Sequence, residues 1–99
     1  MKSFNGRVAA ITGAASGMGR ALALALAREG CHLALADKNG QGLEETVALI
    51  KAQVLAPVLV TSQVVDVSDR QAVEDWAALC AAEHGQINLI FNNAGVALS

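Results

Sequence analysis

Positively charged side chains are scarce and scattered in this sequence. Seven Lys and Arg residues stand against nine Asp and Glu residues, which gives a formal net charge of −2. Proteins that bind nucleic acid or an anionic membrane surface gather their basic residues into a patch or stripe. The sequence has no such cluster, so we expect neither of these partners.

Long apolar runs are absent too. Charged residues such as Arg28, Asp37 and Lys51 interrupt the most apolar stretches, and none of these approaches the ~20 residues that a membrane-spanning helix needs. The first residues lead into a strand-like segment without the small-residue cleavage pattern of a signal peptide. We therefore expect no transmembrane segment and, by default, a cytoplasmic location.

Cysteine occurs only twice. Cys31 and Cys80 lie in apolar surroundings and lack the CxxC spacing of redox and zinc sites. Such thiols are usually buried and reduced. The sequence thus predicts no metal site and no redox role for either residue.

What is present is typical of a globular domain. Hydrophobic residues make up 54% of the 99 residues and charged residues 16%, which argues against disorder and for an interior packed on more than one face. We see no linker, low-complexity tract or internal repeat. The sequence predicts one domain over residues 1–99.

Short apolar runs alternate with helix-like segments. Residues 8–12 form a continuous apolar run closed by Gly13, as expected for a strand buried on both faces. Residues 17–28 are rich in Ala and Leu and precede Gly30, which predicts a helix and its end. Residues 33–36 have the composition of a second buried strand.

The second half of the chain continues this alternation. A second helix ends before Pro57, and offsets of 4, 3 and 4 define its apolar face as Leu43, Val47, Ile50 and Val54. A third strand falls within residues 58–65.

Ser68 and Gln71 form a capping box that starts a third helix, which ends at Gly85. The apolar face of that helix consists of Val73, Trp76, Ala77 and Cys80.

A fourth strand within residues 87–91 completes a βαβαβαβ order. Strands that alternate with helices of this length form a parallel sheet with right-handed crossover connections. We therefore expect an α/β fold of the Rossmann type, with three α/β/α layers and four parallel strands in the order 3-2-1-4.

The segment from Thr12 to Gly19 links the first strand to the first helix. Its glycines follow the pattern G-x-x-x-G-x-G, and its backbone N–H groups lie at the positive end of the helix dipole, where a pyrophosphate binds well. Glycine permits a positive φ and a close approach of backbone to phosphate. Asp37, which ends the second strand, can accept hydrogen bonds from an adenosine ribose.

Three elements of the sequence resemble those of the short-chain dehydrogenase/reductase family. Residues 12–19 resemble its T-G-x-x-x-G-x-G element, residues 92–95 match its N-N-A-G element, and Asp66 with Val67 is similar to its adenine-contacting pair. They occur in the family's order and at the ends of predicted strands. The resemblance covers essentially the whole chain and implies the amino-terminal, dinucleotide-binding half of such an enzyme, truncated relative to the family.

The resemblance also implies individual roles. Ser16 and the backbone around Met18 would hold the pyrophosphate, and Asp37 the adenosine ribose. Residues 66–67 would contact the adenine edge, and residues 93–95 would lie beside the inner ribose. The implied cofactor-binding residues are Thr12, Gly13, Ser16, Gly17, Met18, Gly19, Asp37, Asp66, Val67, Asn93, Ala94 and Gly95.

Thr12 would brace the N-N-A-G turn. Two positions depart from the family pattern. Met18 stands where the family usually has Ile, a swap of similar bulk that should leave a backbone contact intact. Asn88 stands where an Asp commonly precedes the N-N-A-G strand, so a negative charge is missing there.

Each element also has a purely structural interpretation. The glycine-rich segment could be only a tight turn, and Asp37 only a residue on the approach to a helix. Asp66 before a Ser is ordinary turn chemistry. Asn92 and Asn93 suit a turn that tolerates left-handed backbone.

The choice of cofactor depends on two neighbouring residues. A carboxylate at Asp37 would repel the 2′-phosphate of NADP and accept hydrogen bonds from the free hydroxyls of NAD, so we expect NAD. Lys38 leaves NADP open, because its ammonium group could approach a phosphate.

The family's catalytic apparatus is missing from this sequence. The resemblance implies a Tyr activated by a nearby Lys, yet the sequence contains no Tyr. We therefore expect the cofactor-binding portion of an oxidoreductase that acts on an alcohol or carbonyl substrate only in the complete enzyme. Two alternatives are a non-catalytic nucleotide-binding module and an assembly unit that forms homo-oligomers through an exposed sheet edge.

Overall fold

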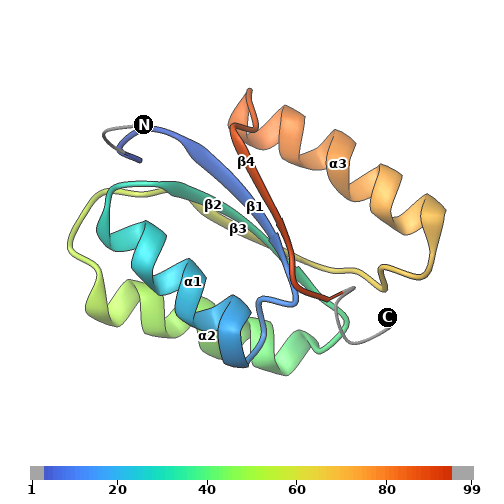
Figure 1. Cartoon of the computed structure of the whole chain (residues 1–99), viewed down its shortest axis with the longest axis horizontal. Helices are drawn as coiled ribbons and strands as arrows, with labels where there is room; N and C mark the ends of the chain where they lie inside the picture. Colours follow the sequence, from blue (N-terminus) through green and yellow to red (C-terminus); the bar gives the residue numbers. More distant parts are fainter. Residues whose placement is uncertain (1–3, 95–99) are drawn as a thin grey trace.

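The computed structural model describes residues 4–94, in which four strands alternate with three helices (Figure 1). In chain order these elements are β1 (Val8–Thr12), α1 (Gly17–Arg28), β2 (His32–Asp37), α2 (Gly40–Gln53), β3 (Val60–Val64), α3 (Arg70–His84) and β4 (Leu89–Asn92). Within the described residues no helix is both long and apolar enough to cross a membrane.

The four strands form one parallel sheet in the order β3-β2-β1-β4. Helices α1 and α2 cover one face and α3 lies on the other, so the domain has three layers (Figure 1). This confirms the predicted fold and strand order. Because β1 and β4 are neighbours, the loops that follow them leave the sheet side by side.

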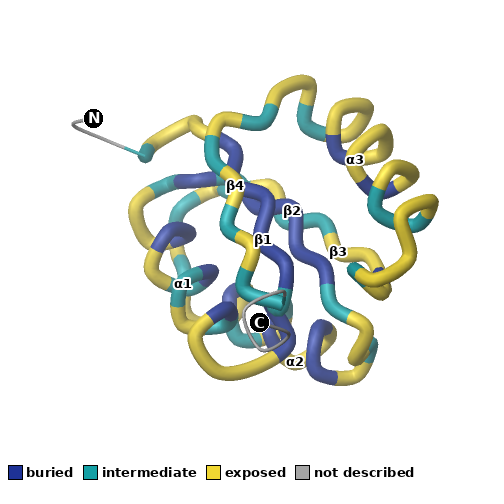
Figure 2. The backbone as a smooth tube through the Cα atoms, turned by 45° about the vertical axis from the view of Figure 1, so that its right-hand side comes forward, coloured by how far each residue is buried: buried dark blue, intermediate teal, exposed yellow. Residues whose placement is uncertain are grey.

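The core lies on both faces of β1 and β2. All five residues of β1 are buried, and the buried positions concentrate along these two strands (Figure 2). One apolar cluster, which includes Ile11, Leu33 and Ile50, fills the space between the sheet and α1 and α2. A smaller one joins the opposite face to Trp76 and Cys80 of α3.

The start of α3 differs from the prediction. Its N-cap is Asp69, whose side chain accepts a hydrogen bond from the Ala72 N–H at 3.2 Å, so the predicted capping box of Ser68 and Gln71 is wrong. Ser68 instead donates its N–H and its hydroxyl to Asp66. The Ser68 hydroxyl therefore bonds to the carboxylate of Asp66 instead of capping the helix.

Two other predictions for the second half need refinement. Ala77 is exposed, whereas Ala72 packs against the core cluster of α3, so the buried face lies slightly further round the helix. The polar residues Thr61, Ser62 and Gln63 belong to β3. They are tolerated because β3 is an edge strand that is only partly buried.

We predict that Leu33→Ala destabilises the domain by about 2–5 kcal/mol, because it opens a cavity in the centre of the sheet. Leu33 is fully buried in β2, whereas Leu55 is 98% exposed and serves as the matched control. The free energy of unfolding can be measured in urea through the fluorescence of Trp76. Equal losses for Leu33→Ala and Leu55→Ala would contradict the position of the core.

Candidate cofactor-binding site

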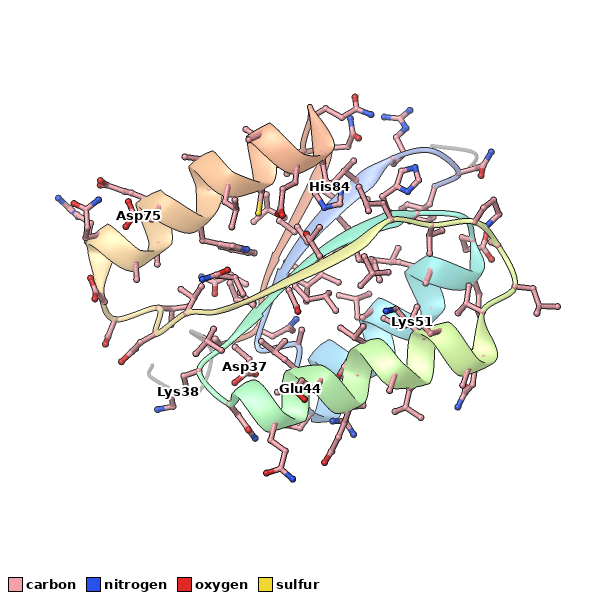
Figure 3. All side chains as sticks on the ribbon, turned by 180° about the vertical axis from the view of Figure 1, so that it is seen from behind. Asp37, Lys38, Glu44, Lys51, Asp75 and His84 are labelled. Carbon is pink, nitrogen blue, oxygen red and sulfur yellow. The ribbon has the colours of Figure 1, made fainter. Side chains whose placement is uncertain are left out.

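A cavity of about 380 Å³ opens at the carboxyl ends of the strands. The loops that follow all four strands contribute to it, which is where α/β sheets of this kind bind ligands. Asp37 and Lys38 lie at this end of the molecule, away from His84 (Figure 3). The lining residues are Gly13, Ser16, Asp37, Lys38, Val65, Asp66, Val67, Ser68, Asn93 and Ala94.

The cavity brings together most of the residues that the sequence predicts for a cofactor site. Four others do not line it. Thr12 lies beneath the loop at the end of β1, Gly17 begins α1, and Gly19 is buried under the loop. Met18 is 76% exposed. Gly95 lies outside the described residues.

Two glycines of the loop are required by close contacts. Gly13 has φ +66°, and a Cβ there would lie 2.9 Å from the backbone nitrogen of Ala94. A Cβ at Gly19 would overlap the carbonyl oxygen of Gly13. The loop after β1 therefore touches both the turn after β4 and the first turn of its own helix, and only glycine leaves room for these contacts.

The backbone of the glycine-rich loop is held at several points. The Ala14 N–H donates to the Ala36 carbonyl at 3.1 Å, and the Ala15 N–H donates to Oδ2 of Asp37 at 3.0 Å. From α2, the hydroxyl of Thr46 donates to the Ala14 carbonyl at 2.8 Å. The loop is thus fixed in shape by protein groups alone.

Arg20 and Thr46 are supporting residues that sequence reasoning missed. Arg20 donates to the carbonyl oxygens of Ala15 and Gly42 and, through Nε, to Thr46 Oγ1 at 2.8 Å. Thr46 is fully buried. The only sequence signals were a polar residue within the apolar first helix and a Thr on the inner face of the second. Neither signal shows that the two helices meet behind the loop.

The carboxylate of Asp37, a half-buried residue, has a structural role. Oδ2 accepts from the Ala15 N–H, and Oδ1 accepts from the Asn39 N–H at 2.9 Å. These bonds hold the carboxylate at the mouth of the cavity, which Asp37 lines. A carboxylate has about four acceptor positions, so it can still accept hydrogen bonds from a ligand.

Asp66, in the loop after β3, is a second carboxylate that lines the cavity. The backbone N–H of Ser68, at 3.0 Å, and its hydroxyl, at 2.8 Å, both donate to Oδ1 of Asp66. These bonds lower the pKa of the Asp66 carboxyl, and the nearby charge of Lys38 lowers it further. Val67 beside it is half-buried, which gives this wall both a carboxylate and an apolar surface.

Thr12 connects the turn after β4 to the end of β1. Its hydroxyl donates to Oδ1 of Asn92 at 2.8 Å and accepts from the Ala94 N–H at 3.3 Å. Asn93 lines the cavity, and its side-chain nitrogen is buried without an acceptor among residues 4–94. That nitrogen is a donor that a bound hydroxyl could satisfy.

Asn88 bonds to the backbone at the start of β1. Its Oδ1 accepts the Val8 N–H at 2.8 Å, and its own N–H donates to the Val8 carbonyl at 2.9 Å. This contact lies at the amino end of β1, away from the cavity. An amide oxygen therefore supplies the acceptor that the Val8 N–H needs.

Other reactive side chains stay apart from the cavity. Cys31 and Cys80 are buried free thiols, and burial raises the pKa of Cys80 to about 11. No group of three or more His, Cys, Asp or Glu residues in the described part of the chain could hold a metal ion. His84 is paired with Thr61 at 2.8 Å, and burial lowers its pKa.

Comparisons with known proteins agree with this geometry. The family model described as short chain dehydrogenase matches residues 7–99. A Mycobacterium tuberculosis protein described as an oxidoreductase, SadH, is 47% identical over 97 residues, which cover 98% of this chain and 34% of that protein. The chain therefore spans about a third of the length of this relative.

Solved structures show the same arrangement of strands and helices. A short chain dehydrogenase/reductase from Burkholderia phymatum in complex with NAD has a TM-score of 0.82 and 38% identity, covering 91% of this chain and 31% of that one. An alcohol dehydrogenase from Thermococcus sibiricus complexed with 5-hydroxy-NADP has a TM-score of 0.78 and 33% identity, covering 85% and 35%. With the fold, the glycine-rich loop and these similarities in agreement, the chain belongs to the short chain dehydrogenase family of oxidoreductases.

Proposed function

We propose that this chain forms the NAD-binding portion of an oxidoreductase that transfers hydride between a nicotinamide cofactor and an alcohol or carbonyl substrate. The observation that carries the proposal is the cavity itself. It collects backbone from the glycine-rich loop, two carboxylates and an unpaired amide donor at the carboxyl end of a parallel sheet.

The groups around the cavity suit the successive parts of a dinucleotide. Ser16, at the N-terminus of α1, would face the diphosphate. Its side chain caps no helix N–H, so its hydroxyl would be available to a ligand. Asp37 would accept from the adenosine ribose, and Asp66 with Val67 would contact the adenine. Asn93 would donate to the inner ribose. When bound, the cofactor supplies the hydride acceptor or donor.

We infer that proton exchange with the substrate hydroxyl depends on residues elsewhere in the complete enzyme. Such exchange requires a positioned acid or base, and the sequence contains no Tyr to serve as one. The described lining residues include no His, and their two carboxylates have the binding roles given above. By itself the chain would thus bind the cofactor without catalysis. A non-catalytic nucleotide-binding module would have the same site.

Asp37 also favours NAD over NADP. Its two backbone hydrogen bonds hold a negative charge where the 2′-phosphate of NADP would approach, and the charges repel each other. Lys38 is exposed and lines the same cavity. Because the Lys38 side chain can turn into solvent whereas Asp37 is fixed, we expect the carboxylate to decide the preference.

We predict that Asp37→Asn weakens NAD binding by about tenfold or more, since bonds to charged groups are the stronger ones. NADP binding should fall far less, because the repulsion of the 2′-phosphate is removed as well. Isothermal titration of both cofactors measures the two affinities. Asp75→Asn, which changes an exposed acid on α3 that does not line the cavity, is the matched control. Equal losses for NAD and NADP would reject the role of Asp37.

One further observation favours assembly as a second candidate function. β4 is an outer strand of the sheet, and Ile90 on it is 74% exposed. An uncovered strand edge with an exposed apolar side chain is a template for pairing with another strand. A second copy of this chain could pair along β4.

We expect, on this second hypothesis, that sedimentation over a concentration series reveals dimers and that Ile90→Lys returns them to monomers. A charge on an edge strand opposes such pairing. Leu55→Lys changes a 98% exposed side chain in the loop before β3 and should leave the dimers intact. A monomer at every concentration of the unsubstituted chain would eliminate the assembly hypothesis.

A further inference from the structure

Strand β3 forms the edge of the sheet opposite to β4, and among the described residues no strand pairs with its outer side. Edge strands usually carry a charge, a proline or a bulge, each of which discourages pairing with another chain. The β3 sequence Val-Thr-Ser-Gln-Val has no charged residue and no proline, and its register with β2 runs without interruption. This edge therefore lacks the usual protection against pairing.

The backbone of β3 presents hydrogen-bonding groups on this outer side at alternate residues. Toward β2, the Leu59 carbonyl accepts a hydrogen bond at 2.9 Å and the Val65 N–H donates one at 3.0 Å. In a parallel ladder every second residue of a strand bonds to the same neighbour, so the odd-numbered positions from 59 to 65 face β2. The N–H and C=O groups of Val60, Ser62 and Val64 consequently point outward.

A second copy of the chain can pair with this edge in an antiparallel register that has two-fold symmetry about Ser62. Val60 then faces Val64 of the second copy, and the two Ser62 residues face each other. Every outward-pointing residue thus meets another outward-pointing residue, and each such pair exchanges two backbone hydrogen bonds. The same patch serves both copies, as a closed two-fold dimer requires.

The charges of α2 fit the same register. Glu44 shares a groove with Val64 at the carboxyl end of β3, and Lys51 shares one with Val60 at the amino end. Figure 3 shows Glu44 toward the end of α2 that lies near Asp37, and Lys51 toward its other end. Antiparallel pairing reverses the second copy along the strand, so Glu44 of each copy comes beside Lys51 of the other. A parallel arrangement would bring like charges together.

Apolar side chains at this edge would be covered as well. Val64 is 59% exposed, although it lies on the α2 side of the sheet, where a Cβ at Gly40 would come within 3.2 Å of it. In the two-fold register Val60 of the second copy lies opposite Val64, and cross-strand pairs of β-branched residues stabilise a sheet. On the other face Leu79 of α3 is 39% exposed beside the same strand.

We propose that the outer edge of β3 is an interaction surface for a second copy of this chain, and that two antiparallel β3 strands join the two sheets into one. The backbone register, the charges of α2 and the exposed Val64 all agree on this arrangement. It does not depend on the proposed function, because no cofactor takes part in the contact.

Charge reversal on α2 tests the register. In sedimentation over a concentration series, Glu44→Lys and Lys51→Glu should each weaken the dimer about tenfold, because symmetry makes each change act twice. Glu44→Lys combined with Lys51→Glu exchanges the two charges and should restore the affinity. Glu74→Lys, which changes an exposed acid on α3 outside the grooves beside β3, is the matched control. A double variant no tighter than the single ones would overturn the register.

A proline in β3 tests the strand itself. Ser62→Pro removes an outward-pointing N–H and keeps the bonds to β2, and proline is tolerated on edge strands, so a folded monomer is expected. Urea unfolding, followed through the fluorescence of Trp76, establishes that the variant is folded. If it does not fold, the charge series still decides, because Glu44 and Lys51 are exposed on a helix surface.

Three outcomes would overturn the inference. The first is a dimer that persists in folded Ser62→Pro. The second is a dimer that Ile90→Lys dissociates, because this result would assign the contact to β4 at the opposite edge of the sheet. The third is a monomer at every concentration of the unsubstituted chain.

Discussion

The close approach of the loop after β1 to its neighbours is the constraint on which the cavity depends. Gly13 touches the turn after β4, and Gly19 lets α1 pack directly on the loop. With a Cβ at either position the loop would have to move outward by backbone displacement, which packed interiors resist. The positions of Ser16, Asn93 and Ala94 around the cavity follow from these two contacts.

Much of this arrangement could be predicted because it depends on local composition. A central parallel strand is buried on both faces, so residues 8–12 read as an unbroken apolar run, and β1 has the same bounds. The carboxyl ends of such strands meet at one edge of the sheet. The residues just after each strand could therefore be assigned to one site without knowledge of any contact.

The features that could not be predicted depend on which of several hydrogen-bond partners a side chain takes, or on how helices pack against each other. At the start of α3, the predicted cap Ser68 bonds to the carboxylate of Asp66 instead, and Asp69 caps the helix. Arg20 and Thr46 are ordinary helix residues in the sequence. Their function arises from the way α1 and α2 meet behind the loop, which no periodicity encodes.

Residues on different sides of the site bond to the same loop segment. The carboxylate that would bind the ribose already holds the Ala15 N–H, and Arg20 holds the carbonyl oxygen of the same residue. A change at Asp37 therefore disturbs the loop as well as the ribose contact, and a change at Arg20 acts on the same short segment. Substitutions that share a partner do not have additive effects. The short segment around Ala15 thus forms one mechanical unit, whose shape is set by contacts within the protein.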